Sequence, residues 1–468
     1  MAVLMATTTS PVGRAAEVTM LTGWGRTAPS AGRVIDLDGD AVRGAPHEAL
    51  PIDEGRGAIP RGLGRSYGDP AQNGGGSVLR VLPGRSPISL DRNAATVTAD
   101  AGVSFDDLLR VLVPAGFFVP VTPGTRFITV GGAIASDIHG KNHHVDGTFG
   151  HHCTRISLLT ADGELRTLTP ADGDLWWATI GGMGLTGLIV DATFDLIPIE
   201  TSQCLVRTQR IANFDALVDT MAADDQRYSV AWVDLLASGA ALGRSVLTCG
   251  EHARLDDLSA KQRRDPLAFA PPSLIDVPRG GPNVLSRAAV RAFNEVWYRK
   301  ARRDHVGPES ITGFFHPLDM VGAWNRLYGG AGFLQYQFVV PDDEVDTMRV
   351  AIERVVASGH ASFLAVLKRF GPANPAMLSF PTSGWTLTLD VPAAASDLHV
   401  LLSELDELVL GAGGRHYLAK DAHITPRIVR AGYPRLAEWK AVRRSVDPHG
   451  YWISDQARRL GLLEEEVA

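Results

Sequence analysis

Arg61-Gly62-Leu63-Gly64-Arg65-Ser66-Tyr67-Gly68-Asp69 is the stretch of sequence that decides the fold, because it fits three different motifs. Spaced as Gly-x-Gly-x-x-x-Gly, it approaches a dinucleotide-binding fingerprint, and as Gly-x-Ser-x-Gly it matches a nucleophile elbow. Both motifs require a helix directly afterwards. The residues that follow, 69–76, contain one proline and three glycines, which disfavour a helix. The stretch is therefore predicted to be a loop whose open backbone N–H groups suit a pyrophosphate.

Two further glycine-rich segments strengthen this interpretation. The first is Pro123-Gly-Thr-Arg-Phe-Ile-Thr-Val-Gly-Gly-Ala-Ile-Ala135, which we expect to be another open loop. The second, Gly182-Met-Gly184-Leu-Thr-Gly187, runs straight into the β-rich residues 188–194 and so also lacks the helix that a dinucleotide fingerprint needs. Tight turns alone could explain one such segment, but three together indicate a long phosphate-linked ligand.

Composition excludes several classes of protein. The 468 residues are 45% hydrophobic and carry a formal charge of −7 from 45 basic and 52 acidic residues, which argues against a disordered chain and against DNA or RNA as partner. Cys153, Cys204 and Cys249 are too few and too far apart for a disulfide framework or a thiolate metal site. Residues 1–21 lack the continuous apolar run of a signal peptide, so we expect synthesis in the cytoplasm.

The order of the patterns predicts two domains and a returning C-terminal segment. Residues 1–199 hold the three glycine-rich segments described above, and within this range 95–103 is predicted to be a strand and 105–113 a helix capped by Ser104. Residues 200–414 alternate strands with helices and form a second α+β unit whose sheet could wall a pocket, with 250–285 as a long, partly mobile excursion. Residues 415–468 are expected to pack back onto the first domain.

These motifs resemble a known family. The pattern Arg-Gly-x-Gly-x-Ser at 61–66, the blocks at 123–140 and the block at 176–187 are similar to the PCMH-type FAD domain of the vanillyl-alcohol-oxidase superfamily. Further matching blocks at 23–30, 137–144, 315–320, 332–338 and 419–421 narrow the resemblance to the decaprenylphosphoryl-β-D-ribose 2′-oxidases, the FAD subunits of an actinobacterial epimerase. The resemblance covers essentially the whole chain. It implies an α+β fold with a PCMH-type FAD-binding domain and an α+β substrate domain with an antiparallel sheet.

The resemblance also implies which residues hold FAD. Many members of the superfamily link FAD to a histidine where this chain has Arg65, and arginine cannot form that bond, so we expect non-covalent FAD. The implied cofactor-binding residues are Pro60, Arg61, Gly62, Leu63, Gly64, Arg65, Ser66, Tyr67, Gly68, Asp69, Pro70, Gly124, Thr129, Val130, Gly131, Gly132, Ser136, Asp137, Ile138, His139, Ile189 and Tyr417.

Catalytic and substrate residues are implied in the same way. The resemblance places Lys420 in the sugar pocket near the flavin, with Tyr67, His139 and Gln337 around it. Lysine can take the hydroxyl proton or orient the substrate, and the sequence leaves both open. The histidine run at 139–152 does not have the spacing of a metal site, so no metal is expected. The implied substrate-pocket residues are Lys141, Trp232, Phe315, Lys368, Thr386 and Thr388.

Three of these positions depart from the family pattern. Phe315 replaces a usual tyrosine and Thr386 a usual asparagine, which makes the pocket less polar. Thr388 stands where many relatives have a cysteine, and that cysteine captures nitroaromatic inhibitors after the enzyme has reduced them to nitroso compounds. We therefore expect this chain to escape covalent trapping.

The function implied is FAD-dependent oxidation of the 2′-hydroxyl of a polyprenyl-phosphoryl-β-D-ribofuranose to the 2′-keto sugar. This would be the first half of an epimerisation to the arabinose form for cell-wall arabinan, completed by an NAD(P)H-dependent short-chain reductase, with a quinone or another electron acceptor. The alternatives are an aldonolactone or alditol oxidase that uses O₂ on a soluble sugar, and a non-catalytic flavoprotein.

Residues 287–303 bear on the location of the enzyme. They carry six basic residues against one acidic residue, with apolar residues at helical spacing. This pattern fits a helix at an anionic lipid surface and fits equally well a helix packed on its own domain. A lipid-linked substrate favours peripheral contact with the plasma membrane.

Overall fold

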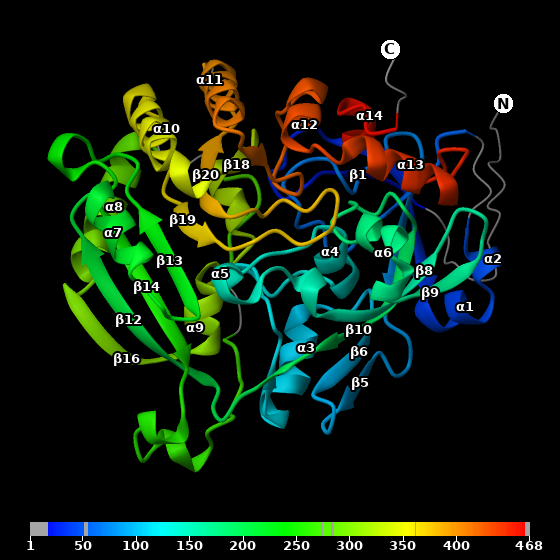
Figure 1. Cartoon of the computed structure of the whole chain (residues 1–468), viewed down its shortest axis with the longest axis horizontal. Helices are drawn as coiled ribbons and strands as arrows, with labels where there is room; N and C mark the ends of the chain where they lie inside the picture. Colours follow the sequence, from blue (N-terminus) through cyan, green and yellow to red (C-terminus); the bar gives the residue numbers. More distant parts are fainter. Residues whose placement is uncertain are drawn as a thin grey trace.

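The computed structural model describes residues 17–50, 55–272, 275–281, 285–360, 362–395 and 397–463. The expected α+β fold is confirmed: mostly antiparallel sheets alternate with helices, and the two N-terminal sheets lie to the right of the large sheet in Figure 1. The start of the predicted N-terminal segment, residues 1–16, lies outside the described part.

Two sheets form the N-terminal half. The first has the order β1 (Glu17–Leu21), β2 (Ser30–Asp38), β4 (Ser77–Leu82), β3 (Ala58–Pro60). The second has the order β5 (Ile88–Asp91), β6 (Thr96–Asp100), β10 (Leu188–Asp195), β8 (Cys153–Leu159), β9 (Leu165–Leu168). Helix α3 (Phe105–Leu112) follows β6 and begins where Ser104 Oγ accepts the N–H of Asp107, so the predicted strand, helix and cap are confirmed.

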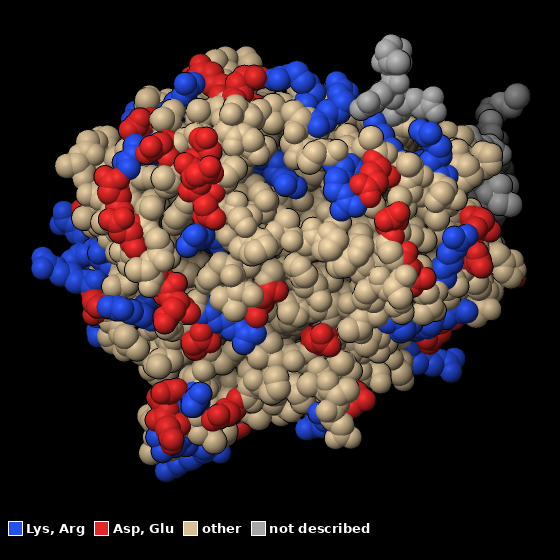
Figure 2. Space-filling view, viewed as in Figure 1, with Lys and Arg blue, Asp and Glu red and all other residues tan. Residues whose placement is uncertain are grey.

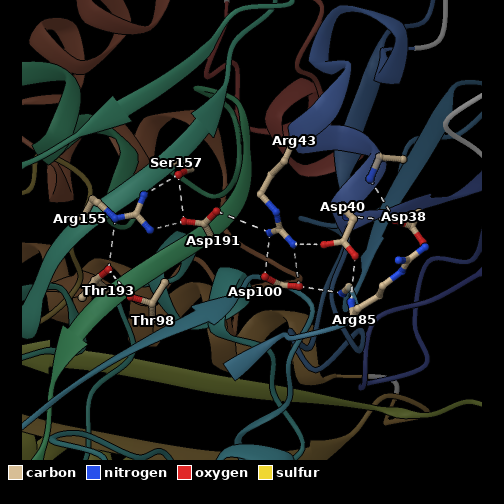
Figure 3. A network of polar contacts seen from close by, with 12 residues as sticks. Asp38, Asp40, Arg43, Arg85, Thr98, Asp100, Arg155, Ser157, Asp191 and Thr193 are labelled. Carbon is tan, nitrogen blue, oxygen red and sulfur yellow. Dashed lines mark hydrogen bonds and ion pairs between the residues drawn. The ribbon is translucent and has the colours of Figure 1, made fainter. Parts of the chain in front are cut away.

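A chain of charges joins the helix that follows β2 to the second sheet. Arg43, on α1 (Gly39–Gly44), donates to Asp100 of β6 at 2.8 Å and lies 3.6 Å from Asp191 of β10. Asp191 also accepts from Arg155 of β8 at 2.6 Å, as Figure 3 shows. The two carboxylates are mostly buried, so the pairing with arginine offsets the cost of removing them from water.

The third large sheet has eight strands. Their order is β16 (Asp304–Ser310), β12 (Gln203–Ile211), β14 (Ser245–His252), β13 (Tyr228–Val233), β19 (Ala365–Phe370), β20 (Gly384–Pro392), β18 (Phe333–Val340), β21 (Arg415–His416). One face packs against α7 (Phe214–Ala222), α10 (Val345–Ser358) and α11 (Leu398–Gly411) through an apolar core that includes Leu247, Phe338 and Leu387. Successive side chains of a strand point to opposite faces, so Gln337 and Thr388 lie on the other face.

The C-terminal segment contacts both halves. Strand β21 pairs with β18, while Trp439, on α13 (Leu436–Val446), donates to the carbonyl of Ala178 in α6 (Asp174–Thr179). Trp452 forms a bridge with Ala58 of β3. The remaining elements are α2 (Pro46–Ala49), β7 (Phe117–Phe118), α4 (Val130–Ala135), α5 (His143–Asp146), β11 (Ile197–Pro198), β15 (Ile275–Asp276), α8 (Arg287–Lys300), α9 (Ile311–Phe315), β17 (Val321–Gly322), α12 (Pro426–Gly432) and α14 (Asp455–Arg459).

One expected loop is partly a helix. Residues 130–135, predicted as open loop, form α4, because Thr129 Oγ1 accepts the N–H of Gly132 and caps the first turn. The cap compensates for the two glycines, which otherwise disfavour a helix. In the predicted excursion at 250–285, residues 273–274 and 282–284 are not described, and β15 pairs in parallel with β17.

No helix within the described ranges combines the length and the apolar character needed to cross a bilayer.

Candidate active site

A cavity of about 1020 Å³ lies between the glycine-rich segments and the open face of the eight-stranded sheet. It brings together 25 of the predicted site residues from all three regions of the chain. From the predicted cofactor and catalytic set, its lining includes Pro60, Arg61, Gly62, Leu63, Gly64, Arg65, Ser66, Tyr67, Pro70, Gly124, Thr129, Gly131, Gly132, Ser136, Ile138, His139, Ile189, Gln337, Tyr417 and Lys420. From the predicted substrate set, it includes Lys141, Trp232, Phe315, Lys368 and Thr388.

Five predicted residues do not line the cavity, and each has a structural role. Asp69 pairs with Arg459 at 2.7 Å, and a Cβ at Gly68 would meet the Asp421 carbonyl oxygen at 1.9 Å. Val130 is fully buried in the core around α3. The side-chain positions of the other two, Asp137 and Thr386, are fixed by buried hydrogen bonds.

Asp137 and Thr386 support the site from behind. Asp137 has a positive φ of 40° and accepts hydrogen bonds from Gly150, Asn374 and Ser379, which orders the turn before His139. Thr386 Oγ1 donates to the Phe338 carbonyl at 2.8 Å and lies 3.3 Å from Gln337 Nε2. Thr386 therefore holds Gln337 rather than facing the cavity.

The glycine-rich loop at 61–68 is shaped to let a ligand approach its backbone. Gly64 has a φ of 65°, and a Cβ there would meet the Arg61 guanidinium at 2.3 Å. Arg61 in turn donates to the carbonyls of Ala71 and Thr22, so it closes the loop on itself. Gly124, across the cavity, has open space where a Cβ would be. This arrangement fits the phosphate end of FAD, because side chains would otherwise fill the cradle.

Arg65 stands where the resemblance would place a histidine bonded to FAD. Its guanidinium lies 3.9 Å from the centre of the Trp24 ring, and burial lowers the pKa of Arg65. The side chain is thus held by a cation–π contact within the cavity wall.

His139 is held between two nitrogen atoms from the large sheet. Its Nε2 lies 3.1 Å from Gln337 Nε2 on β18, and its Nδ1 lies 3.1 Å from Lys368 Nζ on β19. Burial, reinforced by the charge of Lys368, lowers the pKa of His139 well below its ordinary value, so the ring is neutral. A neutral imidazole has one donor and one acceptor nitrogen, so the charge of Lys368 and the orientation of the Gln337 amide are coupled through this ring.

Lys420 lies in the turn after β21, and its Nζ is 4.0 Å from the centre of the Tyr67 ring. Burial lowers the pKa of Lys420 to about 8, against the opposite effect of the Asp390 carboxylate. Lys368 and Lys141, half-buried like Lys420, are also desolvated, and their pKa values fall to about 7 and about 8 for the same reason. Lys141 Nζ donates to the Phe314 carbonyl and lies 4.0 Å from the centre of that residue's ring. Three lysines lining one cavity suit an anionic ligand.

Asp390 is the residue that sequence reasoning missed. It is fully buried on β20, accepts a 2.5 Å hydrogen bond from Gln335 of β18, and lies 3.4 Å from the Tyr328 hydroxyl. Burial raises the pKa of Asp390 to about 7, while Gln335 and Lys420 act in the opposite direction. The sequence did carry a signal for it, because polar residues recur at every second position of two otherwise apolar strands. They are residues 335 and 337 in β18, and residues 386, 388 and 390 in β20, which pairs with it.

The histidine run does not assemble a metal site within the described ranges, where no three His, Cys, Asp or Glu side chains are grouped to hold an ion. His143 accepts from the Gly371 N–H, and His144 and His152 contact the backbone carbonyls of Gln226 and Asp146.

Comparison with known proteins agrees with this geometry. A family model described as an FAD binding domain matches residues 53–169. The chain is 47% identical over 449 residues to the decaprenylphosphoryl-beta-D-ribose oxidase of Mycolicibacterium smegmatis, covering 95% of this chain and 97% of the relative. A Streptomyces coelicolor protein named as an uncharacterized protein in mprA 5′ region is 40% identical over 77% of this chain and 100% of the relative.

A more distant relative is the alditol oxidase of a Streptomyces species, which is 24% identical over 86% of this chain and 90% of the relative. The match to the mycobacterial relative covers nearly the whole chain at close to one identical residue in two. The chain therefore belongs to the decaprenylphosphoryl-β-D-ribose oxidase family of FAD-dependent oxidoreductases.

Proposed function

We propose that this enzyme oxidises the 2′-hydroxyl of a polyprenyl-phosphoryl-β-D-ribofuranose to the 2′-keto sugar, the first half of an epimerisation to the arabinose form for cell-wall arabinan. The observation that carries the proposal is that one cavity is lined both by a glycine cradle and by Lys141, Lys368 and Lys420. The mycobacterial relative is named for the oxidation of a decaprenylphosphoryl ribose, which supports the same substrate class here.

FAD, when bound, accepts a hydride from the carbon that is oxidised. We assign its phosphates to the backbone around Gly62, Gly64 and Gly124, and its ring end to the segment 136–139. Tyr417 supports that segment, since its hydroxyl donates to the Ser136 carbonyl at 2.8 Å. The cofactor is held without a covalent bond in this proposal, because Arg65 cannot supply one.

Lys420 is the proposed acceptor of the hydroxyl proton. A general base works best when its pKa lies near the operating pH, and burial brings the pKa of Lys420 to about 8. Asp390, behind it, stabilises the ammonium that forms when the proton arrives. Tyr67 lies against the Lys420 amine and limits its movement.

His139, Gln337 and the remaining lysines position the substrate in this proposal. His139 and Gln337 form a neutral hydrogen-bonding wall, and Lys368 and Lys141 supply positive charge for the substrate phosphate. Trp232 contributes only its ring to the cavity, since its Nε1 already donates to the Phe363 carbonyl at 3.0 Å. Phe315, which lines the cavity, replaces a tyrosine usual in the family, so this part of the sugar pocket is less polar. Thr386 replaces a usual asparagine but acts through Gln337 instead of facing the cavity.

Two partners complete the proposal. An NAD(P)H-dependent short-chain reductase would reduce the keto sugar to the epimer, and a quinone or another acceptor would reoxidise the enzyme. The enzyme would meet its lipid-linked substrate as a peripheral protein at the plasma membrane.

Anaerobic mixing tests the proposal directly. The oxidised holoenzyme should lose its flavin absorbance within seconds of mixing with polyprenyl-phosphoryl ribose, and mass spectrometry should find a product two hydrogen atoms lighter. Bleaching by soluble alditols or aldonolactones, with peroxide release in air and no reaction with the lipid-linked sugar, would favour the alternative suggested by the alditol oxidase relative.

A further inference from the structure

The cavity does not end at the lysines. The same lining continues to four apolar side chains that are 41–55% exposed to solvent: Phe293 and Trp297 of α8, Met320, and Val321 of β17. Lys300, Arg302 and His305 also line this outer part, and all three are exposed. We call these seven residues the rim.

Exposed apolar side chains continue beyond the rim. Val296, next to Trp297 on α8, is 66% exposed, and Ile275, which pairs with Val321 between β15 and β17, is 83% exposed. The rings of Phe293 and Trp297 stack with centroids 5.9 Å apart. Large apolar side chains gathered at one place on a surface mark a site for a partner or a membrane.

The rim and the chain segment around it also carry net positive charge. Residues 287–303 hold six basic side chains and one acidic side chain, and that acid, Glu295, pairs with Arg244 at 2.7 Å. Asp304 pairs with Arg207 at 2.6 Å. Glu309 is the acidic residue of the outer lining. Figure 2 shows Lys and Arg side chains gathered at the left edge, where Figure 1 draws α8 and β16.

The volume of the cavity indicates why an apolar surface at its mouth is needed. Cavities of roughly 300–1,000 Å³ hold one drug-sized ligand. A cavity of about 1020 Å³ that takes FAD and a sugar phosphate leaves little room for a long polyprenyl chain. Most of that chain must stay outside, in an apolar phase, while the sugar reaches Lys420.

We propose that the rim is the surface by which the enzyme docks on a bilayer of anionic lipids and admits its substrate from it. The apolar side chains enter the interface, and Lys300 and Arg302 meet the lipid phosphates. This inference rests on the proposed function for the identity of the substrate, but the docking surface itself is testable without turnover.

Vesicle flotation of the holoenzyme is the first test. Wild type should float with vesicles of phosphatidylglycerol and phosphatidylcholine, float less with phosphatidylcholine alone, and detach as salt rises. Each basic residue near an anionic bilayer contributes about a fivefold change in partitioning, so Lys300→Glu should weaken binding at least fivefold. Val296→Asp should weaken it similarly. Val400→Asp, at a 49% exposed position on α11, and Arg430→Glu, on α12, are matched controls that should float like wild type.

Turnover then separates the two proposals. Val296 does not line the cavity, so Val296→Asp should bleach at the wild-type rate with a short-chain, water-soluble prenyl-phosphoryl ribose. The same variant should be at least tenfold slower with the long-chain substrate presented in vesicles. Wild-type rates of Val296→Asp with both substrates, or flotation of both Lys300→Glu and Val296→Asp like wild type, would overturn the docking surface.

Two other outcomes have definite meanings. A wild-type dimer that Val296→Asp converts to monomer, without vesicle binding, would show that the rim joins two copies of the chain and would also overturn the inference. Flotation of wild type without bleaching by any prenyl-phosphoryl ribose would leave the docking surface supported and contradict the proposed function.

Discussion

Three half-buried lysines share the cavity, and what distinguishes them is the group that each one faces. Lys420 has a carboxylate behind it, Lys368 has the His139 ring, and Lys141 has a backbone carbonyl. Burial lowers the pKa of all three, but among the described residues a buried carboxylate, Asp390, favours the charged form of Lys420, whereas Lys141 has the exposed Glu309 and two buried thiols. This difference is why we assign proton transfer to Lys420 and anion binding to the other two.

Lys420→Ala should keep its flavin and lose reduction by substrate. Removing a general base costs roughly 10²- to 10⁴-fold in rate, so anaerobic stopped-flow bleaching should slow by that amount. Flavin content, measured from absorbance, serves as the control for folding. Bleaching of this variant at the wild-type rate would remove Lys420 from the mechanism.

Asp390→Asn should move the pH dependence of the reduction step. The rate should rise as Lys420 loses its proton, around pH 8 in wild type. The Asp390 carboxylate favours the ammonium, so its removal should lower the pKa of Lys420 and shift the rise to lower pH. Because the two groups titrate together, the measured midpoint belongs to the pair. An unchanged or more alkaline midpoint would contradict this placement of Asp390.

Thr388→Cys should gain sensitivity to nitroaromatic inhibitors that wild type resists. Thr388 lines the cavity opposite Gln337, so a thiol at this position would face the compound once it has been reduced. The native thiols of Cys153, Cys204 and Cys249 are buried, and burial raises the pKa of each, which leaves almost no thiolate. Intact-protein mass spectrometry after turnover should find one adduct on the variant and none on wild type. An adduct on β20 of the wild-type protein would refute this expectation.

At the scale of elements, the sequence predicted those helices and strands whose formation depends on residues close together in the chain. The helix at 105–112 has its own cap and its own apolar face, so its sequence specified it. The helix at 130–135 was missed because its two glycines suggested a loop, while the Thr129 cap and the packing of Val130 and Ile134 outweighed them. Asp390 was missed because its role arises only when β18 and β20 pair, and a single strand does not reveal its register.

Gly64→Val tests the loop that the sequence did reveal. Valine at a φ of 65° is strained by about 1–2 kcal/mol, and its side chain would displace the Arg61 guanidinium that closes the cradle. The variant should lose bound flavin, measured by the flavin-to-protein absorbance ratio. Gly239→Val is the matched control, since Gly239 has a φ of 61° with no atom near its Cβ position and lies outside the cavity lining. Gly239→Val should have the same backbone strain and keep its flavin. Equal loss of flavin in the two variants would contradict the placement of the cradle.

A second element-scale prediction concerns the segment that carries Lys420. Asp406 of α11 accepts hydrogen bonds from Tyr336 at 2.8 Å and lies 3.1 and 3.2 Å from the Nε2 atoms of His416 and His423, on either side of Lys420. Burial alone would raise the pKa of Asp406, but the bonds from His416 and His423 lower it below its ordinary value. The charged carboxylate therefore fastens this segment to the helix.

Asp406→Asn should destabilise the protein by about 1–3 kcal/mol, the cost of leaving buried donors without their acceptor. Chemical denaturation would measure this loss. The control is Glu404→Gln on the same helix, which removes an exposed ion pair with Arg354 and should change the free energy of unfolding by close to zero. A carboxylate with a lowered pKa stabilises the fold above its unfolded pKa of about 3.9, and this contribution is lost on acidification. Wild type should therefore lose more stability than the variant below about pH 4. Equal stability of wild type and Asp406→Asn at neutral pH would contradict this role.

At the scale of the whole molecule, the cavity is where the N-terminal sheets, the eight-stranded sheet and the C-terminal segment meet. Its lining alternates between distant parts of the chain, with Gly64, His139, Gln337 and Lys420 each from a different segment. A ligand that fills this space contacts all of them at once. Its binding energy therefore contributes to holding the halves together, in addition to the polar contacts between His139 and the large sheet.

Removing FAD should therefore destabilise the entire chain and not just its first half. Since Arg65 cannot bond to the flavin, acid precipitation should leave the flavin in the supernatant, and a milder treatment with chaotropic salt should yield refoldable apoprotein. A ligand at 100 times its dissociation constant stabilises the native state by about 2.7 kcal/mol. Adding FAD back at that level should raise the melting temperature of one transition that tryptophan fluorescence and circular dichroism both report. The melting temperature of Gly64→Val should not change. Flavin that pellets with the protein would show covalent attachment. Two transitions of which FAD moves only one would show that the cofactor stabilises one half alone.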